Sequence, residues 1–391
     1  MQSVPAAFIA AASDPLGYAE EWKRRTGRPV VGTFPMHFPA EVAHAAGALT
    51  MVVQASKEAV TVGGGSFYPF FCGYTRSVVD QATKGRLDFL DAVVFGDHCV
   101  QMLSAADVVR VRRPQLHVGF HQLVPALRDN WSLPNAERTL RNCVADLEEQ
   151  LGVEVSDDAI RESIALYNRG RRAVRELYEL RRSGQVDLTG RQLQDIVKSS
   201  MVMDRQEHTA LLEDFCAQMR DAAGRTSDRR VPVYVSGHLC HAPKPEILDL
   251  IEDCGAVIAD DDLYTGFRYV SCDVEETGDP VQALARWYIE RNEVVPCPTR
   301  LDPSTDWDGF LLDAVRRSGA RGLIVLLVKF CEPHYFYYPR IKATFESHQV
   351  PHLLIETEHE TNAAGNMRTR IEALVELIRR TERPAREEVR P

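Results

Sequence analysis

Short apolar segments alternate with longer segments of helical spacing along much of the chain, and this pattern predicts parallel strands connected by helices. In the first part, buried strands are expected at residues 28–33, 49–53, 92–96 and 116–120. In the last part, strands are expected at 231–236, 256–260, 322–330 and 352–356, with helices at 245–253, 278–292, 306–318, 338–348 and about 364–381. The chain therefore reads as an α/β protein.

The middle of the chain has helical spacing without strand segments. Ser156 is expected to cap a helix that ends at Gly184, and its Arg pairs at 171–172 and 181–182 are expected on the solvated face. The polar segment 223–230 is the clearest boundary. We predict two doubly wound, mainly parallel-sheet halves with a helical segment between them. The predicted divisions are an N-terminal α/β domain 1–129, a helical segment 130–225 and a C-terminal α/β domain 226–391.

Composition narrows the class of protein. A net charge of -10 without a long basic run argues against nucleic acid or an anionic membrane as partner. No segment reaches transmembrane length, and the apolar start lacks the preceding Lys or Arg of a signal peptide. The nine cysteines are an odd number scattered through a long chain, which favours reduced thiols and a cytoplasmic location.

Three cysteines occupy positions that suit ligands. Cys331 follows the apolar run 322–330, and Cys99 follows the expected strand 92–96. Ligands in open α/β sheets bind outside the carboxyl ends of the strands. Cys72 stands at the start of an expected helix, where the helix dipole favours a thiolate. Three thiolates from separate loops would suit a 4Fe–4S cluster with one iron left open.

Other interpretations compete with the cluster. The chain has none of the close-spaced cysteine motifs of ferredoxins or zinc modules, and a lone cysteine is often a small buried hydrophobe. His238, Cys240 and His241 follow a strand and suggest a zinc site, although no fourth ligand stands at zinc spacing. Core packing is expected for the remaining cysteines, namely Cys143, Cys216, Cys254, Cys272 and Cys297.

Two further features bear on chemistry. Glu41 and His44 stand one turn apart at a helix start, which is compatible with proton transfer and equally with a surface or helix-dipole role. The glycines at 63–65 lack the Gly-Lys-Ser/Thr of a phosphate loop, so we expect a flexible surface turn. Since no nucleotide motif occurs elsewhere, any ATP chemistry is expected to come from another chain.

Several segments together resemble the benzoyl-CoA reductase/2-hydroxyacyl-CoA dehydratase family. They are residues 38–47 (FPAEVAHAAG), 72–77 (CGYTRS), 84–91 (KGRLDFLD), 260–269 (DDDLYTGFRY) and 328–334 (VKFCEPH). The resemblance extends from about residue 20 to 380. The second half looks most like a B- or C-type catalytic subunit of ATP-dependent benzoyl-CoA reductases, through residues 292–300 (NEVVPCPTR) and 354–360 (LIETEHE). One departure is FHQLVP at 120–125, where a Leu-Pro-Gln type sequence is expected.

The resemblance implies a cofactor, a site and partners. Cys72, Cys99 and Cys331 would bind a 4Fe–4S cluster beside an aromatic acyl-CoA substrate, and Glu41, with His44 as a neighbour, would border the substrate cavity as a proton donor. A second related catalytic subunit, an ATP-hydrolysing iron–sulfur activator and a ferredoxin donor are expected. The main expectation is reductive dearomatisation of an aromatic acyl-CoA. The alternatives are a 2-hydroxyacyl-CoA dehydratase subunit, a non-catalytic cluster-bearing partner and a metal-free α/β binding protein.

Overall fold

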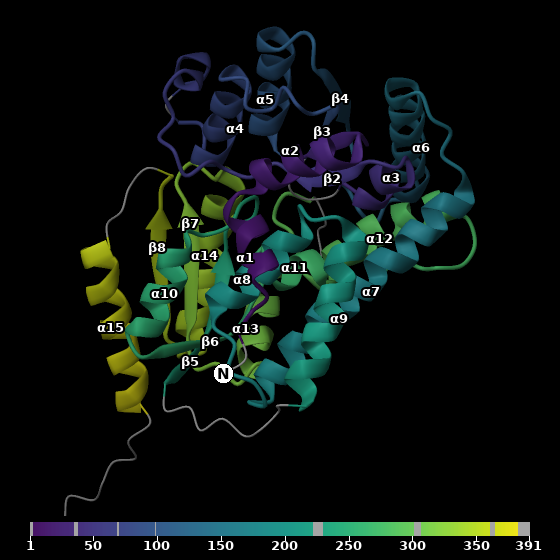
Figure 1. Cartoon of the computed structure of the whole chain (residues 1–391). Helices are drawn as coiled ribbons and strands as arrows, with labels where there is room; N and C mark the ends of the chain where they lie inside the picture. The colour runs from purple at the N-terminus through teal and green to yellow at the C-terminus, as the bar shows by residue number, and fades with distance from the viewer. Residues whose placement is uncertain are drawn as a thin grey trace, which may run out of the picture.

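Two parallel four-stranded sheets form the framework of the chain (Figure 1). The computed structural model describes residues 3–34, 38–68, 70–97, 99–221, 230–300, 306–359 and 364–381. The first sheet has the order β2-β1-β3-β4 and consists of β1 (Val30–Thr33), β2 (Leu49–Val52), β3 (Ala92–Gly96) and β4 (His117–His121). The second has the order β6-β5-β7-β8 and consists of β5 (Val231–Gly237), β6 (Ala256–Asp261), β7 (Leu323–Val328) and β8 (His352–Thr357). The predicted α/β class is confirmed.

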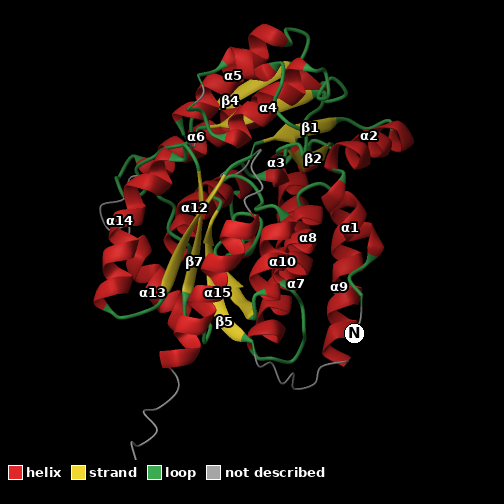
Figure 2. Cartoon of the chain, turned by 90° about the vertical axis from the view of Figure 1, so that its left-hand side faces the viewer, coloured by secondary structure: helices red, strands yellow, loops and turns green. Residues whose placement is uncertain are grey.

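Helices cover both sheets, so the strands are buried on both faces (Figure 2). Every residue of β1, β2, β3 and β7 is buried, which explains their nearly continuous apolar sequences. The helices are α1 (Ala6–Ser13), α2 (Pro15–Thr26), α3 (Ala40–Ala45), α4 (Gly73–Thr83), α5 (Val100–Arg112), α6 (Ser132–Leu151), α7 (Asp157–Arg182), α8 (Gly190–Ser200), α9 (Arg205–Asp221), α10 (Pro245–Asp253), α11 (Phe267–Val270), α12 (Pro280–Val294), α13 (Trp307–Arg317), α14 (Glu332–Ser347) and α15 (Ala364–Thr381). None of these helices is long and apolar enough to cross a membrane.

Strand order reverses at one place in each sheet. The chain leaves β1 toward β2 on one side and returns to β3 on the other, and β5 is flanked in the same way by β6 and β7. Ligand sites of open α/β sheets lie at such reversal points, outside the carboxyl ends of the strands. The loops that follow β3 and β7 are therefore placed for binding.

The middle helices join the two halves. As predicted, Ser156 caps α7, because its hydroxyl accepts a hydrogen bond from the Ala159 N–H at 3.2 Å. Helix α12, which follows β6 in the chain, packs on α6 and enters the same hydrophobic core as β1 and β3. This hydrophobic core therefore contains residues from all three predicted divisions of the chain. The predicted domain division stays a prediction, and its second boundary lies outside the described residues.

Three local expectations need correction. Arg171 and Arg181 are buried, not solvated, at 4% and 8% exposure. Helix α1 was not expected, because its alanine-rich sequence lacks polar spacing, yet Phe8 is fully buried in the core. The glycine segment, expected as a flexible surface turn, is a short 3-10 helix (Gly63–Ser66) whose first residue is buried. The Gly63 N–H donates to Asp80 at 2.8 Å, and a Cβ at Gly63 would lie only 2.5 Å from the Asp80 nitrogen.

Candidate functional site

The three candidate ligand cysteines each occupy the N-cap position of a helix. Cys72 precedes α4, Cys99 precedes α5 and Cys331 precedes α14. Cys99 follows β3 and Cys331 follows β7, so these two come from different sheets. The first turn of a helix presents unpaired backbone N–H groups and a partial positive charge, both of which stabilise a thiolate. Three helix starts therefore supply the same favourable environment.

The three thiols lie close enough to influence one another's ionisation. Burial, together with the charge of the neighbouring Cys72, raises the pKa of Cys99 and that of Cys331 to about 12. Burial also raises the pKa of Cys72, while the Thr75 hydroxyl, 3.2 Å from its sulfur, opposes this shift. Without a metal the thiols are therefore protonated at neutral pH, and metal binding must release their protons.

One buried side chain connects all three cysteine loops. Gln101, in the first turn of α5, accepts a hydrogen bond from the Cys72 N–H at 2.8 Å. Its amide nitrogen donates to the Phe330 carbonyl at 2.9 Å, directly before Cys331. Gln101 itself stands two residues after Cys99 and is 7% exposed. Sequence reasoning missed this residue, because a glutamine near a cysteine carries no signal of its own.

Two further cysteines lie in this region. Burial raises the pKa of Cys240, and the neighbouring Cys99, Cys331 and Cys72 raise it further. Cys240 packs against the hydrophobic cores of both halves, and Cys297 influences both Cys240 and Cys331. Cys240 carried a signal in the sequence, since it follows β5 as Cys331 follows β7. Cys297 carried none, and packing alone had been expected for it.

The chemistry of the three side chains suits an iron–sulfur cluster, because cysteine thiolates are its usual protein ligands. In the described part of the chain, no group of three or more His, Cys, Asp or Glu side chains converges so as to hold one ion. His238 instead hydrogen-bonds the Thr357 hydroxyl at 2.9 Å, and His241 stacks on Tyr74. In an iron–sulfur cluster each thiolate binds a different iron, so the three sulfurs need not meet at one point.

Glu41 and His44 contact α7. The fully buried Glu41 carboxylate forms an ion pair with Arg171, whose guanidinium lies 4.9 Å from the Trp287 ring centroid. His44 lies 2.8 Å from the Ser163 hydroxyl through Nδ1, and burial lowers its pKa, so the ring is neutral at pH 7. These contacts are with α7 and not with the cysteine loops. The proton-transfer role of both residues stays a prediction.

Comparison with known proteins gives the family. A family model described as "2-hydroxyglutaryl-CoA dehydratase, D-component" matches residues 35–378. The chain belongs to this family. A benzoyl-CoA reductase subunit of Thauera aromatica is 26% identical over 86% of this chain and 87% of its own length. The beta subunit of lactoyl-CoA dehydratase from Anaerotignum propionicum is 27% identical over 94% and 96%. The beta subunit of (R)-2-hydroxyglutaryl-CoA dehydratase from Acidaminococcus fermentans is 26% identical over 90% and 93%.

This member of the dehydratase D-component family exposes apolar side chains around its cysteines. Val100 follows Cys99 and is 64% exposed, and Phe336, in the first turns of α14, is 80% exposed. Phe70, two residues before Cys72, is 56% exposed. These three side chains stand near the cysteines in sequence, and exposed apolar side chains of this kind are candidates for contact with a partner protein. The three relatives are likewise named as subunits.

Proposed function

We propose that this chain is a catalytic iron–sulfur subunit of an ATP-dependent benzoyl-CoA reductase, which reduces an aromatic acyl-CoA to a cyclohexadienoyl-CoA. The observation that carries the proposal is the gathering of Cys72, Cys99 and Cys331 at three helix starts, in a chain of this family. A bound 4Fe–4S cluster supplies one-electron transfer at low potential, in a range that extends to about −700 mV.

The chain's own residues would hold and shield this group. Cys72, Cys99 and Cys331 would each bind one iron, and the N–H groups of Tyr74 and Thr75 would stabilise the Cys72 sulfur. The three cysteines are only partly exposed, and low solvent access is one of the factors that set the potential of a cluster. With three cysteine ligands, such a cluster would leave one iron free to bind the substrate.

A dehydratase subunit is the second candidate function. Two of the three relatives described above are named dehydratase subunits, and their identities of 27% and 26% are close to that of the reductase subunit. In a dehydratase the electron is recycled and the product is an enoyl-CoA. In a reductase electrons are consumed and a cyclohexadiene thioester forms. Product analysis with benzoyl-CoA and with 2-hydroxyacyl-CoA separates the two candidates.

Both candidates require partners from other chains. We propose a second related catalytic subunit, an ATP-hydrolysing iron–sulfur activator and a ferredoxin as electron source. The exposed apolar side chains beside the cysteines suit such a contact, and electron transfer needs the partner's redox group to come near. A cluster-bearing chain that only relays electrons is distinguished by its visible spectrum, which would not change when acyl-CoA is added.

The decisive first experiment measures iron and acid-labile sulfide after purification without oxygen. About four of each per chain are expected for a 4Fe–4S cluster. Cys331→Ala should reduce both strongly and abolish activity, because it removes one of three protein ligands. Cys254→Ala is the matched control, since Cys254 follows α10, is partly buried, and contacts the Arg368 carbonyl of α15. Unchanged iron in Cys331→Ala would contradict the proposed site.

A further inference from the structure

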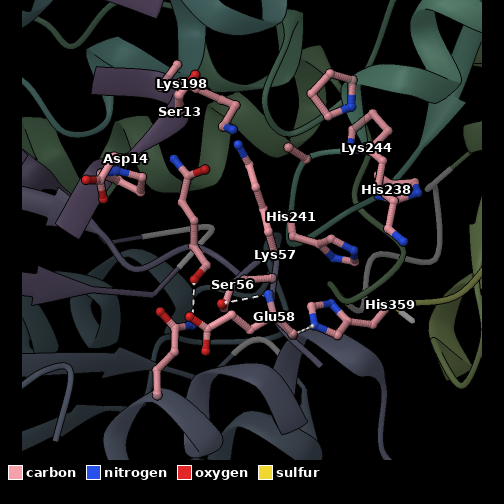
Figure 3. Close-up of a pocket in the computed structure, with 18 of the residues that line it drawn as sticks. Ser13, Asp14, Ser56, Lys57, Glu58, Lys198, His238, His241, Lys244 and His359 are labelled. Carbon is pink, nitrogen blue, oxygen red and sulfur yellow. Dashed lines mark hydrogen bonds between the residues drawn. The ribbon is translucent and has the colours of Figure 1, made fainter. Parts of the chain in front are cut away.

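A cavity of about 430 Å³ is lined by residues of both halves of the chain (Figure 3). Its walls come from the junction of α1 and α2, the loop after β2, helix α8, the loop after β5 and the ends of β7 and β8. The turn that carries Cys240 separates it from the cysteines, because His238 and His241 line the cavity. Its volume lies in the range of small-molecule sites.

Two lysines meet inside this cavity without a carboxylate partner. Figure 3 shows the side chains of Lys57 and Lys198 approaching each other end to end. Lys198, on α8, is only 8% exposed. Within the part of the chain that is described, neither lysine forms an ion pair or a side-chain hydrogen bond. Burial lowers the pKa of Lys198, the charge of Asp195 opposes this shift, and the charge of Lys57 adds to it.

The carboxylates in the cavity wall do not neutralise this pair. Asp80 binds Lys84 at 2.7 Å, and Glu58 lies 3.6 Å from the same ammonium. Glu358 binds Lys329 at 2.9 Å, outside the cavity lining. Two further carboxylates, Asp14 and Glu246, also line the wall, and the Asp14 carboxylate accepts the Gly17 N–H as the cap of α2. Glu246 attracts Lys198 from beyond ion-pair distance.

We propose that this cavity binds a phosphoryl group between Lys57 and Lys198; Lys84, Arg86 and Lys244 are further cations of the lining. Two ammonium groups that face each other, one of them on the buried Lys198, repel, and an anion between them removes both the repulsion and the unpaired charge. Lysine binds phosphate as a compact point charge with three donors. The imidazole of His241, whose pKa burial lowers well below its usual value, remains neutral and can donate a hydrogen bond.

The identity of the phosphoryl compound rests on the proposed function. A CoA thioester carries a 3′-phosphate and a diphosphate, and the cavity adjoins the cysteine site through the stacked rings of His241 and Tyr74, which stands two residues after Cys72. A free nucleotide presents the same phosphoryl chemistry. The two sources differ in whether the pantetheine arm adds to binding.

Titration calorimetry of the full chain, purified without oxygen, tests the proposal. The probes are CoA, 3′-dephospho-CoA, pantetheine and ADP. Binding of CoA with no binding of pantetheine supports a phosphoryl site, and equal affinities for CoA and pantetheine would overturn it. ADP binding as tight as that of CoA would assign the site to a free nucleotide. Weaker binding of ADP would assign it to the coenzyme.

Lysine variants complete the test. Lys198→Met and Lys57→Met should each weaken CoA binding at least tenfold, because each removes one charged donor to the phosphoryl group. Lys342→Met is the control, since Lys342 is half exposed on α14 and lies near Glu346. Lys57 is exposed, so its variant remains informative if Lys198→Met fails to fold. Unchanged CoA affinity in Lys57→Met would refute the proposal.

Thermal unfolding gives a second readout. In phosphate-free buffer Lys198→Met should melt at a higher temperature than the native chain, because it removes a buried unpaired charge. The upward shift caused by CoA should disappear in this variant. A lower melting temperature together with an intact CoA shift would show that Lys198 is only structural. Neither result depends on iron. If the chain holds no cluster but still binds CoA through these lysines, the proposed function is refuted and the phosphoryl site stands.

Discussion

Replacing Gln101 by leucine should loosen the three cysteine loops at once. Leucine has a similar size but neither accepts a hydrogen bond from the Cys72 N–H nor donates one to the Phe330 carbonyl. These hydrogen bonds connect Gln101 to residues that are 29 and 229 positions away in the sequence, so no neighbouring turn replaces them. The effect is expected at Cys72 and at the start of α14, and not in the sheets.

The size of the effect follows from the two bonds. A hydrogen bond contributes about 1 kcal/mol net, and a buried group left unsatisfied costs about 1–3 kcal/mol. The free energy needed to open each loop should therefore fall by about 1–3 kcal/mol, which corresponds to an equilibrium constant for local opening about fivefold to 150-fold larger. Amide hydrogen exchange at Cys72 measures this directly, because its N–H is the donor to Gln101. The iron content after reconstitution should fall as well.

Two other variants make the reasoning refutable. Gln101→Glu keeps an acceptor for the Cys72 N–H but loses the donor to Phe330, so it should loosen the Cys331 loop more than the Cys72 loop. Gln218→Leu is the matched control, since Gln218 is exposed on α9. If Cys72 exchanges equally slowly in Gln101→Leu and in the native chain, Gln101 does not hold the site together.

Two further predictions concern buried charge. Glu41→Gln should destabilise the chain by about 3–5 kcal/mol, because it leaves Arg171 buried without its ion-pair partner. Adding Arg171→Met should restore part of this loss, and urea unfolding measures both effects. An unchanged stability of Glu41→Gln would show that the pair is not structural. Burial lowers the pKa of His208 to about 3, so below about pH 6.5 the unfolded chain binds a proton that the folded chain does not. Stability should therefore decrease as the pH is lowered, by up to about 1.4 kcal/mol per pH unit from this residue. His208→Phe should have a shallower pH dependence of stability between pH 6 and 4. Equal slopes for the variant and the native chain would contradict the assignment.

The strands were predictable because burial on both faces leaves continuous apolar sequences. All eight expected strands are present, and β3 spans the expected residues 92–96. The starts of two helices were harder to predict. Helix α5 begins directly after Cys99 and was not expected, and α14 begins at Glu332 where 338 was expected. A cysteine occupies the N-cap of each and makes no side-chain cap hydrogen bond, so the usual sequence signal of a helix start is absent.

The candidate site was predictable where a residue stands at the edge of a strand or helix. Cys99 and Cys331 were proposed because each follows a strand, and Cys72 because it precedes a helix. Gln101 and Lys198 were not predicted. Gln101 is distinguished by its long-range hydrogen bonds and Lys198 by the lack of an ion pair, and neither feature leaves a sequence pattern. Lys198 has the helical spacing of an ordinary surface lysine, and only the packing of α8 against α1 and α10 buries it. Arg171 was assigned to the surface for the same reason.

The site belongs to neither half alone. Cys72 and Cys99 come from the first half and Cys331 from the second, and the hydrogen bond from Gln101 to Phe330 crosses between them. A cluster held by all three cysteines would bind only the assembled arrangement, so its binding free energy would stabilise the contact between the halves. The lysine cavity has the same property, since Lys57 follows β2 while the loop after β5 forms the opposite wall. Cluster and phosphoryl ligand should therefore each favour the same closed arrangement, and each is expected to strengthen the binding of the other.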